Sequence, residues 1–466
     1  MRESEPQPVT RLTCFKAYDI RGRLGEELNA GIARRIGRAF ADVMGATRVV
    51  LGRDCRASSA ELSQAVAQGL MDAGVEVMDL GLSGTEEMYF ATAHFGADGG
   101  ICVTASHNPM DYNGMKMVKR GSAPLDGPTE FLAIKALAES QDFAPAPGNG
   151  HIWQEHSARG YYVERVLSFV DTAALRPLKI VVNAGNGAAG PTFDAIAAAL
   201  AQKEAPLTFH RLHHAPDSSF PNGIPNPLLV QNRPATAQEV VATGADMGIA
   251  WDGDFDRCFL FDHKGDFVPG EYLVGLLAEA FLAKNKGATI VHDPRVIWNT
   301  QDVVARAGGR AVQARTGHAF VKQVMRDSGA IYGGEMSAHH YFRDFMSSDS
   351  GMIPWLLIIE LLGRSGRSLA ELIESRTAAF PSSGEINFTV TDTRAAIAEV
   401  ETRFGPLAKS RDDTDGLSLS FGEWRVNLRA SNTEPLLRLN VEARGQVDLV
   451  EKGVTQLRAI IGKYQS

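Results

Sequence analysis

The chain has 466 residues, 44% of them hydrophobic and 22% charged, and its formal net charge is −8. This length suggests about three or four domains, and the composition suits folded cores rather than disorder. The acidic balance argues against a protein that wraps nucleic acid. The 4 cysteines stand singly without a CxxC pair, so we expect reduced thiols in the cytoplasm, not a disulfide framework or a zinc knuckle. No apolar leader opens the chain and its longest apolar stretch holds Glu360, which predicts neither secretion nor a membrane span.

A repeated pattern predicts the first three domains. Three segments each read as a strand, a polar or glycine-bearing loop, an amphipathic helix and a second strand: 48–81, 179–212 and 288–317. Their continuous apolar runs are typical of strands buried on both faces of a parallel sheet. Each repeat is followed by a further short strand that ends in polar residues, at 99–108, 245–257 and 330–340. Because ligands gather beyond the carboxyl ends of such strands, we expect these three loops to carry the chemistry.

Composition also predicts where the domains divide. Residues 141–150 form a Pro- and Gly-rich linker, and residues 380–386 mark a second break. The last part has strand-like segments and a closing helix from about Val447, which predicts a smaller α+β domain. The predicted domains are 1–150, 151–262, 263–380 and 381–466.

The first loop, TASHNPMDYNGMK at 104–116, places Ser106 beside His107. Pro109 and the Asn113–Gly114 pair predict an irregular loop. Neighbouring side chains of an extended chain point opposite ways, so we do not expect His107 to act as a general base on Ser106. The G-x-S-x-G motif is absent as well, which disfavours a hydrolase. By itself, Ser106 could equally be a loop-stabilising hydroxyl.

The second loop, WDGDFDR at 251–257, alternates three aspartates: Asp252, Asp254 and Asp256. In a tight loop their carboxylates could converge, and like charges so close need a counter-ion. Oxygen ligands without His or Cys favour Mg²⁺ or a similar ion. An EF-hand is excluded, because Arg257 and His263 stand where it needs glycine and glutamate. An enzyme that uses one of these aspartates as its nucleophile stays open.

Two later loops carry groups that could hold a sugar phosphate. In GEMSAHH, Glu335 and Ser337 share a face and His339 follows, a set suited to sugar hydroxyls. RASNTEP supplies one guanidinium and three further donors, as a phosphate dianion requires: Arg429, Ser431, Asn432 and Thr433. An ordinary polar turn remains an alternative interpretation of RASNTEP, and polar residues of the core or surface remain one of GEMSAHH.

Six motifs, in this order along nearly the whole chain, resemble the α-D-phosphohexomutase family: CFKAYDIRG, TASHNPMDYNGMK, DGDFDR, TGHAF, GEMSAHHYF and RASNTEP. The resemblance implies an α/β protein of four domains around a central cleft. The first three would be related α/β domains, each with a mixed or parallel sheet sandwiched by helices, and the fourth a smaller α+β domain. Ala338 and Arg295 look characteristic of the phosphomannomutases in this family that serve GDP-mannose synthesis.

The resemblance also implies residue roles. Ser106 would carry a phosphoryl group, and the three aspartates would bind Mg²⁺ together with it. Lys116 and Arg257 would polarise the transferring phosphoryl, and the catalytic set would further include His107, Arg21 and His318. Glu335 and Ser337 would hold the sugar hydroxyls, and the RASNTEP residues would clamp the other phosphate. The remaining implied substrate-binding residues are Tyr18, Arg295, Gly317 and His339.

The implied reaction interconverts mannose 6-phosphate and mannose 1-phosphate through phosphoserine and a hexose 1,6-bisphosphate, which also serves as activator. Mg²⁺ is the expected cofactor and small phosphosugars are the expected partners, without nucleic acid or membrane. A monomer or weak homodimer is expected. The alternatives are a phosphoglucomutase or dual-specificity mutase, a Mg²⁺-dependent sugar phosphatase, and a phosphosugar-binding protein without catalysis.

Overall fold

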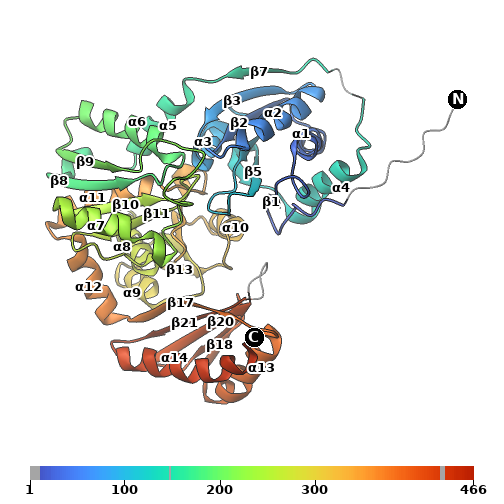
Figure 1. The fold of residues 1–466 in the computed structure, drawn as a ribbon. Coiled ribbons are helices and arrows are strands. Elements are labelled where there is room, and N and C mark those ends of the chain that lie inside the picture. The colour runs from blue at the N-terminus through green and yellow to red at the C-terminus, as the bar shows by residue number, and fades with distance from the viewer. Residues whose placement is uncertain (1–10, 146–147, 431–435, 466) are drawn as a thin grey trace. The chain divides into compact units, whose positions relative to one another are not determined.

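The computed structural model describes residues 11–145, 148–430 and 436–465. It divides into two compact units, Met1–Leu260 with Ser348–Glu360, and Phe261–Ser347 with Leu361–Ser466. Each unit contains two sheets (Figure 1). Among the described residues, no helix is long and apolar enough to cross a membrane.

The first sheet of the first unit follows the order β1-β5-β4-β2-β3-β7. Its strands are β1 (Ile20–Arg23), β2 (Arg48–Arg53), β3 (Glu76–Leu82), β4 (Gly99–Val103), β5 (Tyr112–Lys119), β6 (Ala123–Pro124), which pairs with β5, and β7 (His151–Gln154). The accompanying helices are α1 (Ala30–Met44), α2 (Ser59–Asp72), α3 (Thr85–His94) and α4 (Leu132–Ser140).

Helices cover both faces of this sheet. Gly99 and Gly100 are neighbours on β4, so their missing side chains would point to opposite faces. A Cβ on Gly99 would meet the ring of Phe40 in α1 at 2.6 Å, whereas one on Gly100 would meet Thr92 in α3 at 2.1 Å. The helices pack so close to the strand that only glycine fits at these two positions.

The second sheet of this unit has the order β11-β10-β8-β9. Its elements are β8 (Leu178–Asn183), β9 (Leu207–Leu212), β10 (Met247–Trp251) and β11 (Cys258–Asp262), with α5 (Ala158–Leu167), α6 (Ala189–Gln202), α7 (Pro234–Thr243) and α11 (Ile353–Ser365). The two-residue strand β16 (Ser348–Asp349) precedes α11.

The second unit begins with a sheet of order β13-β12-β14-β15. It consists of β12 (Thr289–His292), β13 (Arg310–Gln313), β14 (Tyr332–Gly334) and β15 (His340–Phe342), with α8 (Gly270–Lys284), α9 (Trp298–Arg306), α10 (His318–Ser328) and α12 (Leu369–Ala379).

These three sheets repeat one arrangement, as the sequence predicts. A central strand (β2, β8 or β12) pairs in parallel with the strand after its helix, β3, β9 or β13. On its other side it pairs in parallel with β4, β10 or β14. The polar loops at Ser106, Asp252 and Glu335 follow these last three strands directly. The predicted equivalence of the three loops is therefore confirmed.

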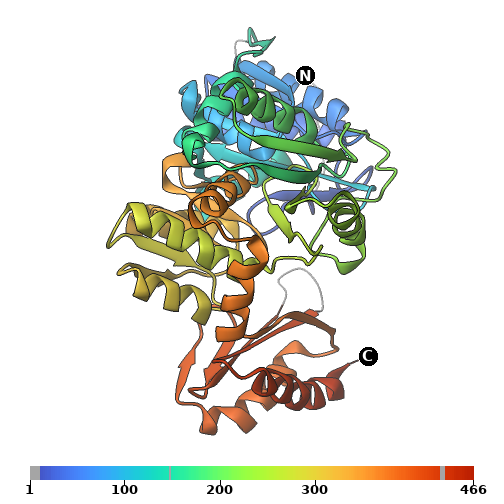
Figure 2. The same ribbon diagram turned by 90° about the vertical axis from the view of Figure 1, so that its left-hand side faces the viewer.

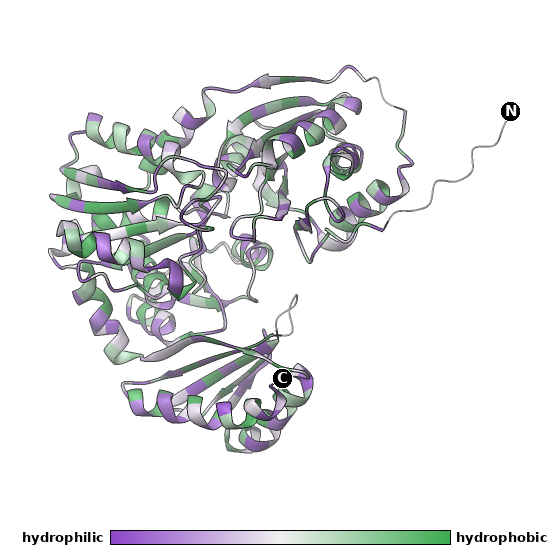
Figure 3. Cartoon of the chain, in the orientation of Figure 1, coloured by the Kyte–Doolittle hydropathy of each residue, from purple (hydrophilic) through white to green (hydrophobic). Residues whose placement is uncertain are grey.

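The fourth sheet is antiparallel, with the order β17-β21-β20-β19-β18. Its elements are β17 (Ser382–Thr389), β18 (Ser410–Asp412), β19 (Leu417–Ser420), β20 (Trp424–Ala430) and β21 (Leu436–Ala443), with α13 (Thr393–Phe404) and α14 (Val447–Ile461). Both helices lie on one face of the sheet (Figures 1 and 2). Hydrophobic and hydrophilic residues alternate along these strands (Figure 3), because one face packs on the helices.

A strand begins within the second predicted break. Residues 382–386 belong to β17, because Ser382 and Glu385 pair with β21. The glycine that suggested a break, Gly384, has φ +63° and lies at a register shift of the strand. A β-bulge accommodates such a glycine without ending the pairing.

Candidate active site

Ser106 lies in a tight loop after β4. Its backbone has φ +47°, a left-handed conformation that is uncommon for a residue other than glycine. The Ser106 amide donates to Thr104 Oγ1 at 2.8 Å, and the Asn108 amide donates to the Ala105 carbonyl at 2.9 Å. These bonds hold Ser106 in a buried position, with 3% of its surface exposed.

The prediction that Ser106 and His107 point apart is wrong. Ser106 Oγ lies 3.0 Å from His107 Nδ1, within hydrogen-bond distance. The expectation assumed extended backbone, whereas the left-handed turn at Ser106 brings the two side chains to the same side. Desolvation and the adjacent Arg257 guanidinium lower the pKa of His107, so its ring is neutral. Its Nδ1 accepts a hydrogen bond from Arg257 Nη2 at 2.5 Å.

The three aspartates converge in the loop between β10 and β11. Phe255 turns the chain with φ +47°, and one carboxylate oxygen from each of Asp252, Asp254 and Asp256 lies within 4.8 Å of the others. All three side chains are buried. Convergence in a tight loop, one of the two arrangements that alternation allowed, is therefore confirmed.

The serine loop and the aspartate loop touch each other. Ser106 Oγ donates a hydrogen bond to Asp252 Oδ2 at 2.6 Å. A Cβ on Gly253 would lie 2.5 Å from the Ser106 carbonyl oxygen, so only glycine allows this backbone approach. The serine hydroxyl is thus placed directly against the acidic cluster.

Two cations face the three carboxylates. Lys116, on β5, donates to Asp254 Oδ2 at 2.8 Å and also pairs with Asp256. Arg257 donates to Asp252 Oδ2 from Nε at 2.9 Å and from Nη2 at 2.7 Å. The cluster keeps an excess of negative charge, which favours a further cation.

The pKa shifts reflect these pairs. Burial by itself would lower the pKa of the Lys116 ammonium, but Asp254 and Asp256 outweigh it and raise that pKa above its ordinary value. Burial and then the charge of Asp254 raise the pKa of Asp256. Burial also opposes the ionisation of Asp254, yet Lys116 holds its pKa below the ordinary value.

The donor set fits a hard divalent cation. Asp254 Oδ1 is buried and accepts no hydrogen bond from the described residues, although Oδ2 accepts one from Thr85 at 2.7 Å. A buried carboxylate oxygen without a donor is costly unless an ion or water satisfies it. The acidic cluster offers only oxygen atoms, which are the ligands that Mg²⁺ prefers.

Arg21 belongs to the same region of the first unit. It lies on β1, pairs with Asp19 at 3.3 Å and donates to the carbonyl of Thr104 at 2.8 Å. It therefore contacts the strand end that leads into Ser106. Tyr18 lies just before β1 and is 37% exposed.

The predicted sugar loop forms a second group of site residues, in the second unit. Glu335 Oε1 accepts the amide of Gly317 at 2.9 Å, and its Oε2 accepts the hydroxyl of Tyr341 at 2.6 Å. Ser337 Oγ lies 3.3 Å from Arg295 Nη2 and 3.3 Å from His339 Nδ1. The structure thus brings five of the predicted residues together.

Glu385, on β17, is a member of this group that sequence reasoning missed. Its carboxylate accepts from Arg429 at 3.1 Å, from Arg295 at 3.4 Å and from Arg438 at 3.4 Å. Burial opposes its ionisation, but the three arginines lower the pKa of Glu385 below its ordinary value. Nothing in the sequence signals this role, because the partners come from separate elements.

The remaining predicted residues are placed as follows. His318 is the first residue of α10 and is half-buried. Arg429 lies on β20 and contacts Glu385. Ser431, Asn432 and Thr433 lie outside the described residues.

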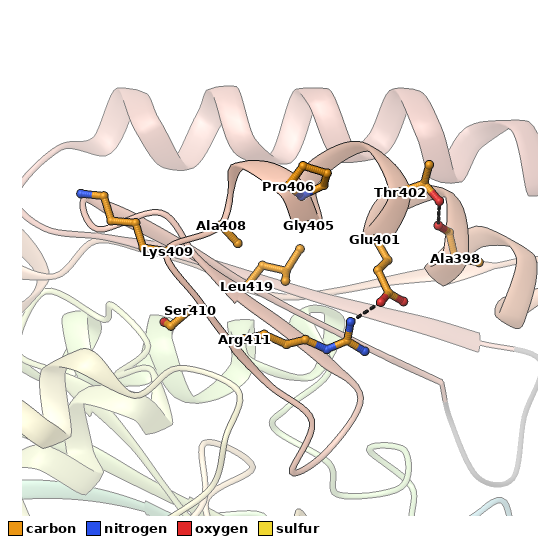
Figure 4. Close-up of a pocket in the computed structure, with 10 residues that line it drawn as sticks. All are labelled: Ala398, Glu401, Thr402, Gly405, Pro406, Ala408, Lys409, Ser410, Arg411 and Leu419. Carbon is orange, nitrogen blue, oxygen red and sulfur yellow. Dashed lines mark hydrogen bonds and ion pairs between the residues drawn. The ribbon is translucent and has the colours of Figure 1, made fainter.

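A pocket of about 670 Å³ lies between α13 and strands β18 and β19 (Figure 4). Its lining includes Glu401, which pairs with Arg411, and Lys409. None of the predicted site residues is among those that line it, so the pocket is separate from the chemistry described above.

Comparison with known proteins agrees with this arrangement of loops. Four domain families of phosphoglucomutase/phosphomannomutase match in order: domain I at residues 12–145, domain II at 160–265, domain III at 269–380 and the C-terminal domain at 385–460. The chain belongs to the phosphoglucomutase/phosphomannomutase family, and the expected membership in the α-D-phosphohexomutases is confirmed, as is the expected architecture of three α/β domains and a smaller fourth.

Its curated relatives include phosphomannomutases. The chain is 58% identical to the phosphomannomutase of Salmonella typhimurium over 98% of this chain and 100% of that protein. It is 56% identical to the phosphomannomutase of Escherichia coli strain K12, over 98% and 100% of the two chains. Among solved structures, a phosphoglucomutase/phosphomannomutase family protein from Burkholderia thailandensis matches with TM-score 0.85 and 34% identity, over 96% and 97% of the chains.

Proposed function

We propose that this protein is a phosphomannomutase, which interconverts mannose 6-phosphate and mannose 1-phosphate through a phosphoserine at Ser106. The observation that carries the proposal is the contact of Ser106 Oγ with Asp252 at 2.6 Å, inside a cluster of three carboxylates. A serine held against a cation site suits a phosphoryl carrier, because a bound cation offsets the charge of the phosphate. The phosphomannomutase relatives support this substrate.

The proposed reaction moves two phosphoryl groups in turn. Phospho-Ser106 transfers its phosphoryl to O1 of mannose 6-phosphate: the bond to Ser106 Oγ breaks, the bond to O1 forms, and the O1 proton ends on Oγ. The product is mannose 1,6-bisphosphate, which turns around. Ser106 Oγ then accepts the phosphoryl from O6, whose oxygen takes the serine proton, and mannose 1-phosphate leaves.

The residues of the first unit would position and polarise the phosphoryl group. Asp252, Asp254 and Asp256 would hold Mg²⁺ together with the phosphate, and the bound cation supplies charge stabilisation for phosphoryl transfer. Lys116 and Arg257 would neutralise charge on the phosphoryl oxygens. His107, whose Nδ1 lies 3.0 Å from Ser106 Oγ, would pass the proton between the serine oxygen and the sugar oxygen.

The second group would hold the sugar and its other phosphate. Glu335 and Ser337 suit the sugar hydroxyls, flanked by Arg295, Gly317 and His339. Arg429 would clamp the non-reacting phosphate together with Ser431, Asn432 and Thr433. We further assign substrate contact to Tyr18 and roles in proton transfer or reorientation to Arg21 and His318.

The proposal also covers the domain bounds, the activator, the oligomeric state and the cellular compartment of the enzyme. We assign domains to residues 1–150, 151–262, 263–380 and 381–466. Hexose 1,6-bisphosphate would activate the enzyme by restoring phospho-Ser106. A monomer or weak homodimer in the cytoplasm, supplying GDP-mannose synthesis, fits small phosphosugar substrates.

A coupled assay with mannose 1-phosphate and with glucose 1-phosphate, in the presence of Mg²⁺ and a hexose 1,6-bisphosphate, tests the proposal. We expect turnover of mannose 1-phosphate at the higher kcat/KM; higher kcat/KM with glucose 1-phosphate would make the protein a phosphoglucomutase. Intact mass should show one added phosphate, absent from Ser106→Ala and present in a control, Ser168→Ala, whose hydroxyl bonds only the Arg165 carbonyl among its described contacts.

The alternative functions give different results in the same experiment. A phosphatase that uses an aspartate would release inorganic phosphate and would tolerate Ser106→Ala. A binding protein would bind the phosphosugar without converting it. Turnover of neither sugar would overturn the mutase proposal.

A further inference from the structure

Arg56 lies in the loop between β2 and α2, and its side chain reaches the serine loop. Its guanidinium donates to four main-chain carbonyls: Ser106 at 3.0 Å, Asn108 at 2.5 Å, Pro109 at 2.9 Å and Tyr112 at 3.2 Å. The residue is buried, with 3% of its surface exposed. One side chain therefore satisfies most of the backbone acceptors along the segment that carries Ser106.

Asp54 holds Arg56 in place. Its carboxylate accepts the Arg56 amide at 3.0 Å and pairs with the guanidinium at 3.5 Å. The Asp54 amide in turn donates to the Val103 carbonyl at 3.0 Å, at the end of β4. Arg56 is thus anchored, through Asp54, to the end of β4, from which the serine loop departs.

The serine loop needs such support for a physical reason. Ser106 has a left-handed backbone, which a non-glycine residue keeps only where its surroundings enforce it. The carbonyls of Ser106, Asn108 and Pro109 lie between β4 and β5, outside the sheet ladder, and a buried carbonyl requires a donor. A planar guanidinium with five N–H groups can serve several carbonyls at fixed angles, which an ammonium cannot do.

We propose that Arg56 is a positioning residue for phosphoryl transfer at Ser106: it binds four main-chain carbonyls between residues 106 and 112 and fixes the direction of the serine oxygen. The inference rests on the proposed function, and Arg56 itself touches neither substrate nor phosphoryl group. Phosphoryl transfer depends chiefly on positioning, so a small displacement of Oγ lowers the rate of the chemical step rather than sugar binding.

The test compares Arg56→Lys and Arg56→Ala with Arg38→Ala. Arg38 lies in the same part of the chain and also donates to main-chain carbonyls, of Asp72 at 3.0 Å and of Ala144, but it has no described contact with the serine loop. For each variant we would measure kcat, KM, the thermal midpoint, phosphate at Ser106 by intact mass, and hydrogen exchange of residues 104–112.

We expect Arg56→Ala to lower kcat by roughly 10²-fold, with KM changed by less than about threefold. Arg56→Lys keeps the charge but not the fork of donors, and should still lose about tenfold or more of kcat. Hydrogen exchange should accelerate in residues 104–112 of both variants and not in Arg38→Ala, whose kcat should stay within about twofold of the wild type.

Three results would overturn the inference. Arg56→Lys could fold with wild-type kcat, Arg38→Ala could lose as much kcat as Arg56→Ala, or exchange of residues 104–112 could stay unchanged. A wild-type protein without turnover overturns the proposed function instead, together with the catalytic part of this inference. Hydrogen exchange then still decides whether Arg56 orders the loop.

Discussion

The aspartate loop after β10 and the sugar loop after β14 occupy the same place in a repeated sheet, yet they differ in net charge and in how their carboxylates are hydrogen-bonded. In the first, three buried carboxylates face two cations and retain an acceptor without a donor, Asp254 Oδ1. In the second, each oxygen of the Glu335 carboxylate already accepts a hydrogen bond, from the Gly317 amide or the Tyr341 hydroxyl. The repeated fold therefore supplies a position for function, and the loop residues decide what binds there.

The two regions also differ in how their charges are balanced. The aspartate loop has an excess of negative charge, so it is complete only with an added cation. The sugar loop and its arginines are neutralised by carboxylates of the chain itself, Asp293 and Glu385. We expect the first region to control the chemical step and the second to control binding, which the following variants test.

The largest loss of activity should come from Asp254→Asn. The amide keeps an acceptor for Lys116 and Thr85 but removes the charge that would hold the cation. We expect kcat to fall on the order of 10³-fold, and removal of Mg²⁺ by a chelator to do the same to the wild type. Steady-state kinetics over a Mg²⁺ titration measure this.

A matched variant is Asp98→Asn, which removes a carboxylate that binds Thr47 and Arg48 and has no described contact with the aspartate loop. Its kcat should stay within about threefold of the wild type if the protein folds. Equal losses in the two variants would contradict the special role of Asp254.

A smaller effect is expected from Ser337→Ala in the sugar loop. The hydroxyl would bind a sugar hydroxyl, and the loss of one neutral hydrogen bond is worth about 1 kcal/mol. KM should rise roughly three- to tenfold while kcat changes little. A fall in kcat at constant KM would mean that the sugar loop acts in the chemical step. That result would contradict the expected division between chemistry in the aspartate loop and binding in the sugar loop.

Glu385→Gln should strengthen phosphosugar binding, whereas Ser337→Ala should weaken it. Without the carboxylate, Arg295 and Arg429 lose a competing anion, and the apparent affinity for the phosphosugar should rise roughly two- to fivefold. Arg295, Arg429 and the half-buried Arg438 would then repel one another, lowering the unfolding free energy by about 1–3 kcal/mol. Calorimetric titration with phosphosugar and denaturant unfolding measure the two effects.

The control for this variant is Glu399→Gln, which removes a carboxylate that pairs with Lys463 and bonds Tyr464 in the same C-terminal region. Its described contacts include no predicted site residue, so phosphosugar affinity should not change. Weaker binding in Glu385→Gln would show that Glu385 orients the arginines rather than competes for them.

The smallest effect on activity is expected at His340, which lies on β15 beside the sugar loop. Burial lowers the pKa of this histidine to about 3. In the unfolded chain it takes up a proton near pH 6.5, whereas the folded state resists protonation until about pH 3. Stability is therefore lost as the pH falls through this window, by up to about 5 kcal/mol.

His340→Gln should reduce that loss and leave activity near pH 7.5 within about twofold of the wild type. The quantity to measure is the difference in unfolding free energy between wild type and variant from pH 7 to pH 4, since the other titrating groups cancel. A difference that does not change with pH would contradict the buried, neutral state of His340.

Much of the fold could be predicted because it depends on local patterns. The continuous apolar runs indicated parallel strands, and repetition of the pattern placed the loops of Ser106, Asp252 and Glu335 at equivalent strand ends. Convergence of the aspartates could be expected from their spacing. The strand over residues 382–386 was not expected within the predicted break, because Gly and Ser are as typical of a bulged strand as of a break.

The sequence by itself determined the repeated strand order, the four loops and the kind of chemistry each one offers, because these depend on residues close together in the chain. Only the tertiary structure decided which groups meet. The Ser106–His107 contact depends on a left-handed backbone angle, and Arg56, Thr85 and Glu385 reach their partners from distant segments. Such contacts leave no periodic or compositional trace, since they arise where separate elements pack against one another.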